Sequence, residues 1–388
     1  MAQYKNQKLI TVVFIDDGIN PSFIPNDINF ENYQADEKCI SECEPINGVS
    51  HGTVCYQIFH NNTHRKYKLI SIKILDETGI GNMKALLSAL RWCISQNVDL
   101  INMSMGTVQY TDFAPIAKEI NHMSKTIIIA ACSNRNHLTF PACLPNVIGV
   151  RHCEREELID CFVYIPNSYD NIDVMTCIRD IPMMFGYGDN IIINGANSFA
   201  TPFITAQVLE YVSQGYNTID MIRQKLICDS VKDNSCTTFE FYKNLICDWN
   251  VIDIPIVALV DSSQESADTL TQLLNIFIKN GYCAIILSQS EKTCITNYTY
   301  ELNTQLSDID TIPNLIELYY NFAQPDILFL QIDLQELLHL PKKGIKADII
   351  LKSPATPLFE YTDWNEKHIL DITTPPIALF SHITKLLS

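Results

Sequence analysis

Short apolar runs alternate with amphipathic segments over the first two-thirds of the chain. A strand is predicted where a run is short and rich in β-branched residues, and a helix where apolar side chains recur every three or four positions, as between Leu86 and Ile94. The predicted strands span residues 8–15, 68–75, 98–103 and 126–131, and the predicted helices span 83–96 and 202–213. Because strands alternate with helices, the pattern predicts a parallel sheet covered on both faces.

The same alternation starts again near residue 250. Strands are predicted at 256–260, 282–287, 326–332 and 347–351, and helices at 266–280 and 312–322. We therefore expect two domains, 1–250 and 251–388, of which the second is a smaller α/β unit. Its first strand–helix–strand unit is typical of nucleotide-binding folds, but the turn at 261–265 lacks the glycines and the lysine that cradle a phosphate. We expect a degenerate P-loop-like or Rossmann-like domain that binds no nucleotide and serves substrate recognition, partner recognition or dimerisation.

Composition and charge narrow the class of protein. Hydrophobic residues make up 47% of the 388 positions and charged residues 18%, which is enough apolar material for packed cores. The formal net charge of −17 disfavours nucleic acid and anionic membranes as partners. No apolar run reaches the roughly 18 residues that span a bilayer. Fourteen cysteines in a long chain without a recognisable export signal predict reduced thiols and a cytoplasmic location.

Five polar motifs follow predicted strands or open predicted helices. They are VVFIDDG at 12–18, HGT at 51–53, NMSMG at 102–106, AACSN at 130–134 and NSFATP at 197–202. The carboxyl ends of parallel strands meet at one edge of a sheet, and residues that are far apart in sequence can meet there.

Three residues in these motifs suit nucleophilic catalysis. A serine hydroxyl becomes a good nucleophile when a base takes its proton and a carboxylate holds that base, and Ser198, His51 and Asp16 supply these groups. The side-chain amide of Asn134 and the backbone N–H of Ser198 are candidate donors to an oxyanion. Each residue type alone is most often structural, so the prediction depends on the joint pattern. A zinc site at Cys39 and Cys43 lacks a second ligand pair, and we expect no metal and no cofactor.

These segments resemble the subtilisin-like serine proteases (subtilases) over residues 8–215, and the order Asp, His, Ser is that of the family. The resemblance implies a subtilisin-like parallel sheet flanked by helices and a serine endopeptidase acting on a peptide or precursor protein. It also implies that Asp16 orients His51, that His51 moves the proton, that Ser198 attacks the carbonyl and that Asn134 stabilises the oxyanion. By the same resemblance, the substrate lies extended between Gly79, Ile80 and Gly81 on one side and Ser104, Met105 and Gly106 on the other.

The sequence departs from the family pattern at three positions. Asp17 stands where the family has a small hydroxyl residue. Because it is adjacent to Asp16, we expect the two carboxylates to raise one another's pKa. Ser133 and Ala196 replace glycines, and we expect a strained turn at these positions. The segment 51–75 is shorter than in secreted members of the family, and residues 61–68 within it are basic, so we also expect no family-type calcium site. We expect no N-terminal inhibitory prodomain of the family type, and therefore another form of restraint.

Together these features predict a cytoplasmic endopeptidase that processes one specific peptide or precursor, such as the leader of a ribosomally made peptide natural product. Homo-oligomers could form through the C-terminal domain. The alternative is a catalytically impaired subtilase-fold scaffold that binds peptides, with catalysis impaired by Asp17, Ser133 or Ala196. A nucleotide-regulated protease is a third interpretation.

Overall fold

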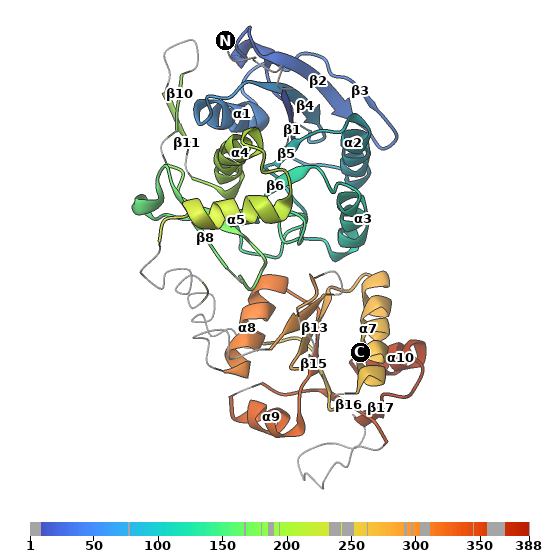
Figure 1. The fold of residues 1–388 in the computed structure, drawn as a ribbon. Coiled ribbons are helices and arrows are strands. Elements are labelled where there is room, and N and C mark those ends of the chain that lie inside the picture. The colour runs from blue at the N-terminus through green and yellow to red at the C-terminus, as the bar shows by residue number, and fades with distance from the viewer. Residues whose placement is uncertain are drawn as a thin grey trace. The chain divides into compact units, whose positions relative to one another are not determined.

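The computed structural model describes residues 9–76, 78–166, 168–179, 181–184, 190–193, 195–232, 242, 252–261, 263–290, 293–295, 298–302, 311–343, 345–354 and 369–387, with 181–184 and 190–193 described by their backbone alone. The chain divides into two compact units, Met1–Val108 with Asp112–Asn234, and Gln109–Thr111 with Ser235–Ser388 (Figure 1). The domain boundary that we expect between residues 250 and 251 lies outside the described residues.

A nine-stranded sheet forms the centre of the N-terminal unit. Its strand order is β3-β2-β4-β1-β5-β6-β7-β9-β8. The strands are β1 Ile10–Asp16, β2 Asn29–Ala35, β3 Ile40–Glu42, β4 Tyr67–Lys73, β5 Leu100–Met103, β6 Ile127–Ala131, β7 Ile148–His152, β8 Phe162–Tyr164 and β9 Val174–Thr176. The strands from β2 to β9 in this order pair in parallel, and only β3 and β8, at the two edges, pair antiparallel. The predicted parallel sheet is confirmed.

Helices cover both faces of this sheet. They are α1 His51–Asn61, α2 Met83–Gln96, α3 Tyr110–Asn121, α4 Asn197–Ser213 and α5 Ile219–Asp229. In Figure 1, α1 and α4 lie on one face and α2 and α3 on the other. The side chains of Val12 and Phe14 belong to the core formed with α1 and α4, and the intervening Val13 and Ile15 are equally buried on the opposite face. Burial on both faces explains why β1 reads as a continuous apolar run.

Smaller elements complete the fold. Strands β10 Ile181–Met184 and β11 Asn190–Ile193 form a separate antiparallel pair, and short 3₁₀ helices occupy Pro21–Phe23, Glu156–Leu158 and Leu340–Lys343.

The C-terminal unit contains a second parallel sheet, with the order β14-β13-β15-β12-β16-β17. Its strands are β12 Ile256–Leu259, β13 Ala284–Ser288, β14 Thr299–Glu301, β15 Ile327–Gln331, β16 Ile349–Lys352 and β17 Ile369–Asp371. Its helices are α7 Gln264–Lys279, α8 Ile312–Ala323, α9 Leu334–His339 and α10 Pro376–Leu387. Helices α7 and α10 pack together through Phe277 and Phe380, whose ring centroids are 4.7 Å apart. The predicted α/β character of this part is confirmed.

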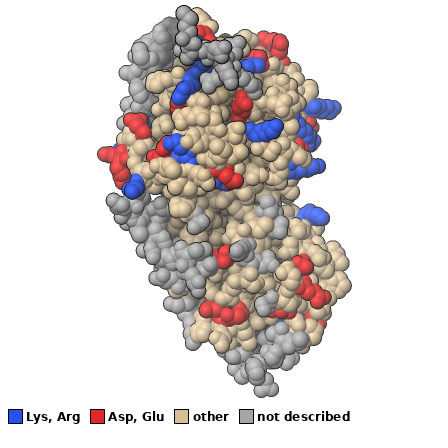
Figure 2. Space-filling view, viewed as in Figure 1, with Lys and Arg blue, Asp and Glu red and all other residues tan. Residues whose placement is uncertain are grey.

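Lys and Arg side chains are interspersed with Asp and Glu on the face of the N-terminal unit that Figure 2 shows. Among the helices in the described residues, none combines the length and the apolar character that a membrane span needs.

The side chain of Arg223 fastens α5 to the sheet. Its Nε donates to Asp173 Oδ1 at 2.9 Å, and its other nitrogens donate to the carbonyl oxygens of Pro145 at 2.7 Å and Val147 at 3.0 Å. Asp173 is buried and also accepts a hydrogen bond from the backbone N–H of Gly149. Burial raises the pKa of Asp173, whereas the charge of Arg223 opposes this shift. The guanidinium therefore neutralises a carboxylate that would be costly to bury alone.

Replacing this guanidinium tests its role. We expect Arg223→Met to lower the free energy of unfolding of the N-terminal unit by about 3 kcal/mol at pH 7, because it leaves a buried charge unpaired. Without Arg223, the folded-state pKa of Asp173 rises further, so the stability deficit is largest above that folded-state pKa and shrinks as the pH falls through it. Urea unfolding at pH 7 and pH 5 measures both effects.

The matched control is Lys225→Met on the same helix. It removes a more exposed ion pair, in which Lys225 Nζ lies 2.6 Å from Asp229 Oδ1, and we expect a much smaller loss of stability than in Arg223→Met. Equal losses in the two variants at pH 7 would contradict the role assigned to Arg223.

Candidate active site

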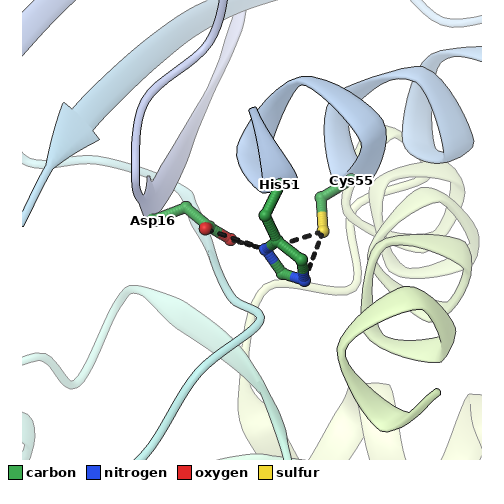
Figure 3. A group of neighbouring side chains, drawn as sticks. All are labelled: Asp16, His51 and Cys55. Atoms are coloured by element: carbon green, nitrogen blue, oxygen red, sulfur yellow. Dashed lines mark hydrogen bonds and ion pairs between the residues drawn. The ribbon is translucent and has the colours of Figure 1, made fainter. Parts of the chain in front are cut away.

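The carboxyl end of β1 and the first turn of α1 meet at the edge of the N-terminal sheet. Asp16 is the last residue of β1 and His51 is the first residue of α1. The Nδ1 atom of His51 lies 2.9 Å from Oδ1 and 3.1 Å from Oδ2 of Asp16, whose side chain is only 1% exposed (Figure 3). The structure therefore brings two of the three predicted catalytic residues into hydrogen-bond contact.

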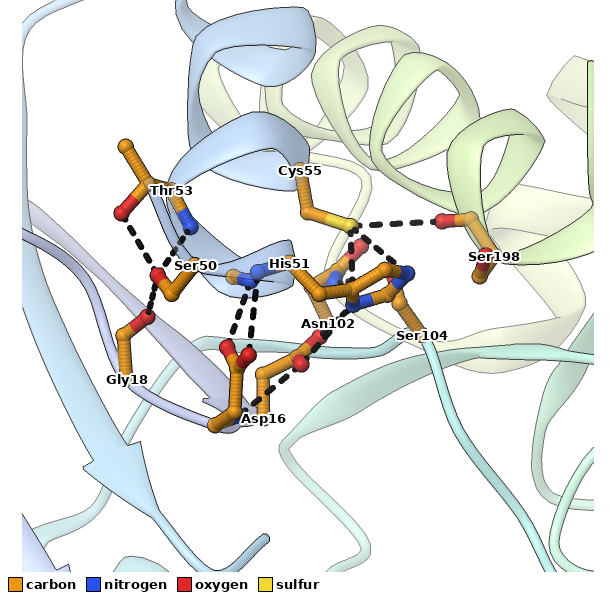
Figure 4. Close-up of polar contacts among 11 residues, drawn as sticks. Asp16, Gly18, Ser50, His51, Thr53, Cys55, Asn102, Ser104 and Ser198 are labelled. Carbon is orange, nitrogen blue, oxygen red and sulfur yellow. Dashed lines mark hydrogen bonds and ion pairs between the residues drawn. The ribbon is translucent and has the colours of Figure 1, made fainter. Parts of the chain in front are cut away.

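The residues around His51 explain why α1 begins here. Ser50 is the N-cap: its Oγ accepts from the N–H of Thr53 at 3.1 Å and donates to the carbonyl oxygen of Gly18 at 2.6 Å (Figure 4). Thr53 Oγ1 in turn accepts from the backbone N–H of Asn20 at 2.9 Å. A Cβ atom on Gly52 would lie 2.6 Å from the carbonyl oxygen of Gly18, so only glycine allows this close approach. The HGT motif thus binds α1 to the loop after β1.

Cys55 lies one helical turn after His51 and contacts both His51 and Ser198. Its Sγ is 3.7 Å from Nδ1 and 3.9 Å from Nε2 of His51, and it donates to the carbonyl oxygen of Ser198 at 3.5 Å (Figure 4). Proline at position 202 has no N–H, so the Ser198 carbonyl lacks the helix donor four residues on. The Cys55 thiol supplies that missing donor and connects α1 to α4.

Two neighbours set the protonation of His51. A thiolate at Cys55 would raise the pKa of His51 most, and the hydrogen bond and the charge of Asp16 raise that pKa as well, against the effect of burial. Burial also raises the pKa of the Cys55 thiol, which keeps its proton at neutral pH. At neutral pH, the Asp16 contact is therefore the interaction that favours the imidazolium form of His51.

The same three residues form the group that could hold a metal ion within the described residues. The ligand atoms of Asp16, His51 and Cys55 all lie within 4.8 Å of one another. Imidazole, thiolate and carboxylate are zinc ligands. However, Nδ1 of His51 already bonds Asp16, and the Cys55 thiol is a donor to Ser198. These hydrogen bonds account for the cluster, and the absence of a metal stays a prediction.

Ser198 is the second residue of α4 and is half-buried. The ring of the next residue, Phe199, packs beside His51 with 5.2 Å between ring centroids. Between the described atoms of Ser198 and His51 the structure has no hydrogen bond. In the absence of substrate, such catalytic contacts are commonly long, and they tighten when substrate binds.

Asn134 follows β6 and contacts the start of α4. Its Oδ1 accepts from the backbone N–H of Asn197 at 3.1 Å, and Oδ1 of Asn197 accepts from the backbone N–H of His152 at 2.7 Å. Among the described residues, nothing accepts from Nδ2 of Asn134 or from the backbone N–H of Ser198. Two free donors therefore lie next to each other at this helix start. His152 contributes its backbone N–H to this contact, whereas its ring Nδ1 accepts from the backbone N–H of Ile178 at 3.2 Å.

Ser133 and Ala196 stand where the family pattern has glycines. The backbone strain expected there is not observed, so that expectation is wrong. Ala196 is the N-cap of α4 with φ −151° and ψ 159°, extended backbone that any residue adopts. Ser133 does not have a positive φ. In contrast, the raised pKa expected for the adjacent acids is confirmed at Asp17, where burial and the charge of Asp16 both raise it.

The predicted substrate edge at 79–81 is a tight turn. The N–H of Ile80 donates to Asp76 Oδ1 and its carbonyl accepts from the N–H of Asp76, both at 3.0 Å, so its backbone is engaged. Its side chain is 69% exposed. Gly81 forms a single antiparallel bridge with Leu75, and no described residue hydrogen-bonds to the Gly81 backbone. Gly79 has a positive φ and donates its N–H to Asp76.

The second predicted edge follows β5. Oγ of Ser104 accepts from Nδ2 of Asn102 at 3.0 Å, and Oδ1 of Asn102 accepts from Thr205 of α4 at 2.8 Å. No described residue hydrogen-bonds to the backbone of Ser104, Met105 or Gly106. This edge therefore has backbone donors and acceptors left for another strand.

The C-terminal unit contains a cavity of its own, of 420 Å³, at the carboxyl ends of β12, β13 and β15. Its polar lining residues are Asp261, Gln289, Ser290, Gln331 and Asp333. A phosphate placed there would face two carboxylates, and no lysine or arginine is among the residues that line the cavity. Absence of nucleotide binding stays a prediction, and this lining agrees with it.

Comparison with known proteins extends this picture. The sequence model of the subtilase family matches residues 7–231. Minor extracellular protease Epr of Bacillus subtilis (strain 168) is 26% identical over 155 residues, 37% of this chain and 23% of Epr. Subtilisin DY of Bacillus licheniformis is 30% identical over 184 residues, 46% of this chain and 65% of that protein. The chain thus spans less than two thirds of either relative. The structure of a cold adapted subtilisin-like serine proteinase aligns with a TM-score of 0.46 and 19% identity, over 59% of this chain and 85% of that chain.

The contact between Asp16 and His51 predicts that the pKa of the His51 imidazole depends on the Asp16 carboxylate. We expect Asp16→Asn to lower the pKa of His51 by about one to three pH units, because the neutral amide no longer stabilises the imidazolium. The measurement is the pH dependence of the imidazole resonances in NMR spectra. His60 is an internal control: it bonds the hydroxyl of Tyr67 at 2.7 Å, burial lowers its pKa, and its titration should stay the same. An unchanged His51 titration would show that the carboxylate does not act on the ring.

Proposed function

Because the chain belongs to the subtilase family, we propose that it is a serine endopeptidase that uses Asp16, His51 and Ser198 as its catalytic triad. The observation that carries this proposal is the pair formed by the buried Asp16 carboxylate and Nδ1 of His51, beside the helix start that bears Ser198. Peptide or protein is then the substrate class, and the reaction is hydrolysis through an acyl-enzyme.

Each of the three residues has a step in the proposed reaction. Nδ1 of His51 faces Asp16, so Nε2 is the nitrogen that can take the proton from Ser198 as its Oγ attacks the scissile carbonyl. Asp16 keeps the imidazole in this tautomer and stabilises the imidazolium that forms. His51 then gives the proton to the leaving amine, and water repeats the sequence on the acyl-enzyme.

The start of α4 is suited to stabilise the oxyanion. The backbone N–H of Ser198 and Nδ2 of Asn134 are both free among the described residues, and the bond from Asn197 fixes the orientation of the Asn134 amide. The positive end of the helix dipole adds a favourable potential at the same place. Donors that are oriented before the reaction need no rearrangement when the charge develops.

The substrate would bind as an added strand. The backbones of Gly81 and of Ser104, Met105 and Gly106 supply free donors and acceptors, whereas Ile80 would contribute its exposed side chain and not its engaged backbone. This mode requires an extended, accessible peptide, which agrees with the processing of a flexible leader or precursor segment. The twelve described cysteines are free thiols, which agrees with action in the reducing cytoplasm. The C-terminal unit would then recognise the precursor or pair two copies.

An active-site serine probe tests the proposed activity. We expect a fluorophosphonate to label the wild-type chain and to leave Ser198→Ala unlabelled, because that variant lacks the hydroxyl that we propose as the nucleophile. Ser213→Ala, at the far end of the same helix, is the matched control and should be labelled like the wild type. A folded but unlabelled wild type would instead favour the peptide-binding scaffold.

A second variant isolates the oxyanion donor. Asn134→Asp keeps an oxygen that can accept from the Asn197 N–H but removes the Nδ2 donor. We expect the second-order rate of probe labelling to fall by about 10²–10³-fold, the usual loss for one such donor. Asn136→Asp makes the same chemical change two residues on and should label at the wild-type rate. Equal rates for Asn134→Asp and the wild type would remove Asn134 from the mechanism.

A further inference from the structure

The carboxylate of Asp17 is directed at the first turn of α1. Its Oδ2 accepts from the backbone N–H of His51 at 3.0 Å, and its Oδ1 accepts from the backbone N–H of Gly52 at 2.7 Å. These are the first two residues of the helix, whose N–H groups have no partner inside it. One carboxylate therefore satisfies two consecutive donors, and both bonds are charge-assisted.

The third N–H of this turn belongs to Thr53 and is satisfied by the N-cap, Ser50. The start of α1 is thus closed by two side chains, of which only Ser50 comes from the helix's own sequence neighbourhood. Asp17 is 34 positions away from His51, at the end of β1. Its negative charge also lies at the positive end of the helix dipole. Its hydrogen bonds therefore fix where α1 starts relative to β1.

Asp17 also contacts Asp16, the hydrogen-bond partner of His51. Its backbone N–H donates to Oδ1 of Asp16 at 2.9 Å, the same oxygen that bonds Nδ1 of His51. The residue thus holds the Asp16 carboxylate with its backbone and the His51 backbone with its side chain. A Cβ atom on Gly52 would lie 3.1 Å from Asp17 Oδ1, so the glycine leaves room for this contact.

We propose that Asp17 is a positioning residue that holds the backbone of His51 in register with Asp16, so that the imidazole is in place before substrate binds. This inference rests on the proposed function, in which His51 is the base. The two oxygens of the carboxylate match two consecutive N–H groups, whereas a hydroxyl reaches one of them and an amide offers only one acceptor.

This arrangement makes ionisation of Asp17 less favourable. Burial, and then the charge of Asp16, raise its pKa, while the hydrogen bonds from Gly52 and His51 lower it. Two carboxylates are thus kept side by side, and the hydrogen bonds to α1 offset part of their repulsion.

Amide hydrogen exchange tests the geometry without using activity. In Asp17→Asn of the full chain, we expect at least one of the His51 and Gly52 amides to exchange about tenfold faster or more, since a charge-assisted bond is lost. The matched control is Asp36→Asn, where an exposed carboxylate accepts from the N–H groups of Lys38 at 2.7 Å and Cys39 at 2.8 Å. It should leave His51 and Gly52 unchanged. Wild-type exchange at both amides in Asp17→Asn would overturn the proposal.

Probe labelling supplies the functional readout. We expect Asp17→Asn to label at least about tenfold more slowly than the wild type, because a small displacement of a catalytic group is costly. The described titratable groups that face His51 are Asp16, Asp17 and Cys55, so removing one negative charge should also move the acid limb of the labelling profile to lower pH. A variant with a lowered melting temperature but the wild-type rate and profile would overturn the positioning role.

Asp17→Thr is the second variant, should Asp17→Asn not fold. Its hydroxyl can accept from only one N–H, and we expect a labelling rate below that of the wild type. An Asp17→Thr rate equal to the wild type would contradict the need for two acceptors. A wild type that is not labelled would overturn the proposed function instead, and the exchange rates would then decide alone whether Asp17 fixes His51.

Discussion

A buried carboxylate at the end of the first strand must find hydrogen-bond donors, and the N-terminal unit is arranged around this requirement. An isolated charge with the burial of Asp16 would cost several kcal/mol. Its donors are the backbone N–H of Asp17 and the imidazole of His51, which is 35 positions away in the sequence. Strand β1 ends at Asp16, and α1 must begin where the imidazole of His51 can reach that carboxylate. Gly52 and Ser50 make that close approach possible.

The position of α4 follows from the same kind of requirement. Pro202 deprives the Ser198 carbonyl of a helix donor, and the thiol of Cys55 replaces it from α1. A backbone acceptor left without a donor in a buried place is costly, so the two helices are held together by more than apolar packing. Because Cys55 and His51 lie on one face of α1, the bond that satisfies Ser198 also brings its turn beside the imidazole.

Much of the fold could be predicted from the sequence because its central elements are apolar on both sides. Helix α2 has the predicted bounds, 83–96, and β1, β4, β5 and β6 lie within a residue or two of the predicted runs. The polar strand β2, which lies between β3 and β4, was not predicted, since its sequence NFENYQA has no continuous apolar run.

The motifs likewise predicted which residues belong to the site, but not how each one is bonded. Sequence spacing could not tell that the carboxylate of Asp17 turns toward α1, or that Ala196 is extended and unstrained. Such details depend on where an oxygen points after the chain has folded. Cys55 offered one usable signal, its position four residues after His51 on the same helix, but the donor it replaces is visible only beside Pro202.

The two helices at the site use the same property in opposite ways. The first N–H groups of any helix lack internal partners and attract negative charge. At α1 these groups are closed by Asp17 and Ser50, so that part of the helix cannot receive a ligand and serves to hold His51 in place. At α4 the N–H of Ser198 has no partner among the described residues, and the side-chain amide of Asn134, which bonds the adjacent Asn197 N–H, adds a second donor. Under the proposed mechanism, the closed helix start fixes the base before reaction, and the open one receives the charge that develops during it.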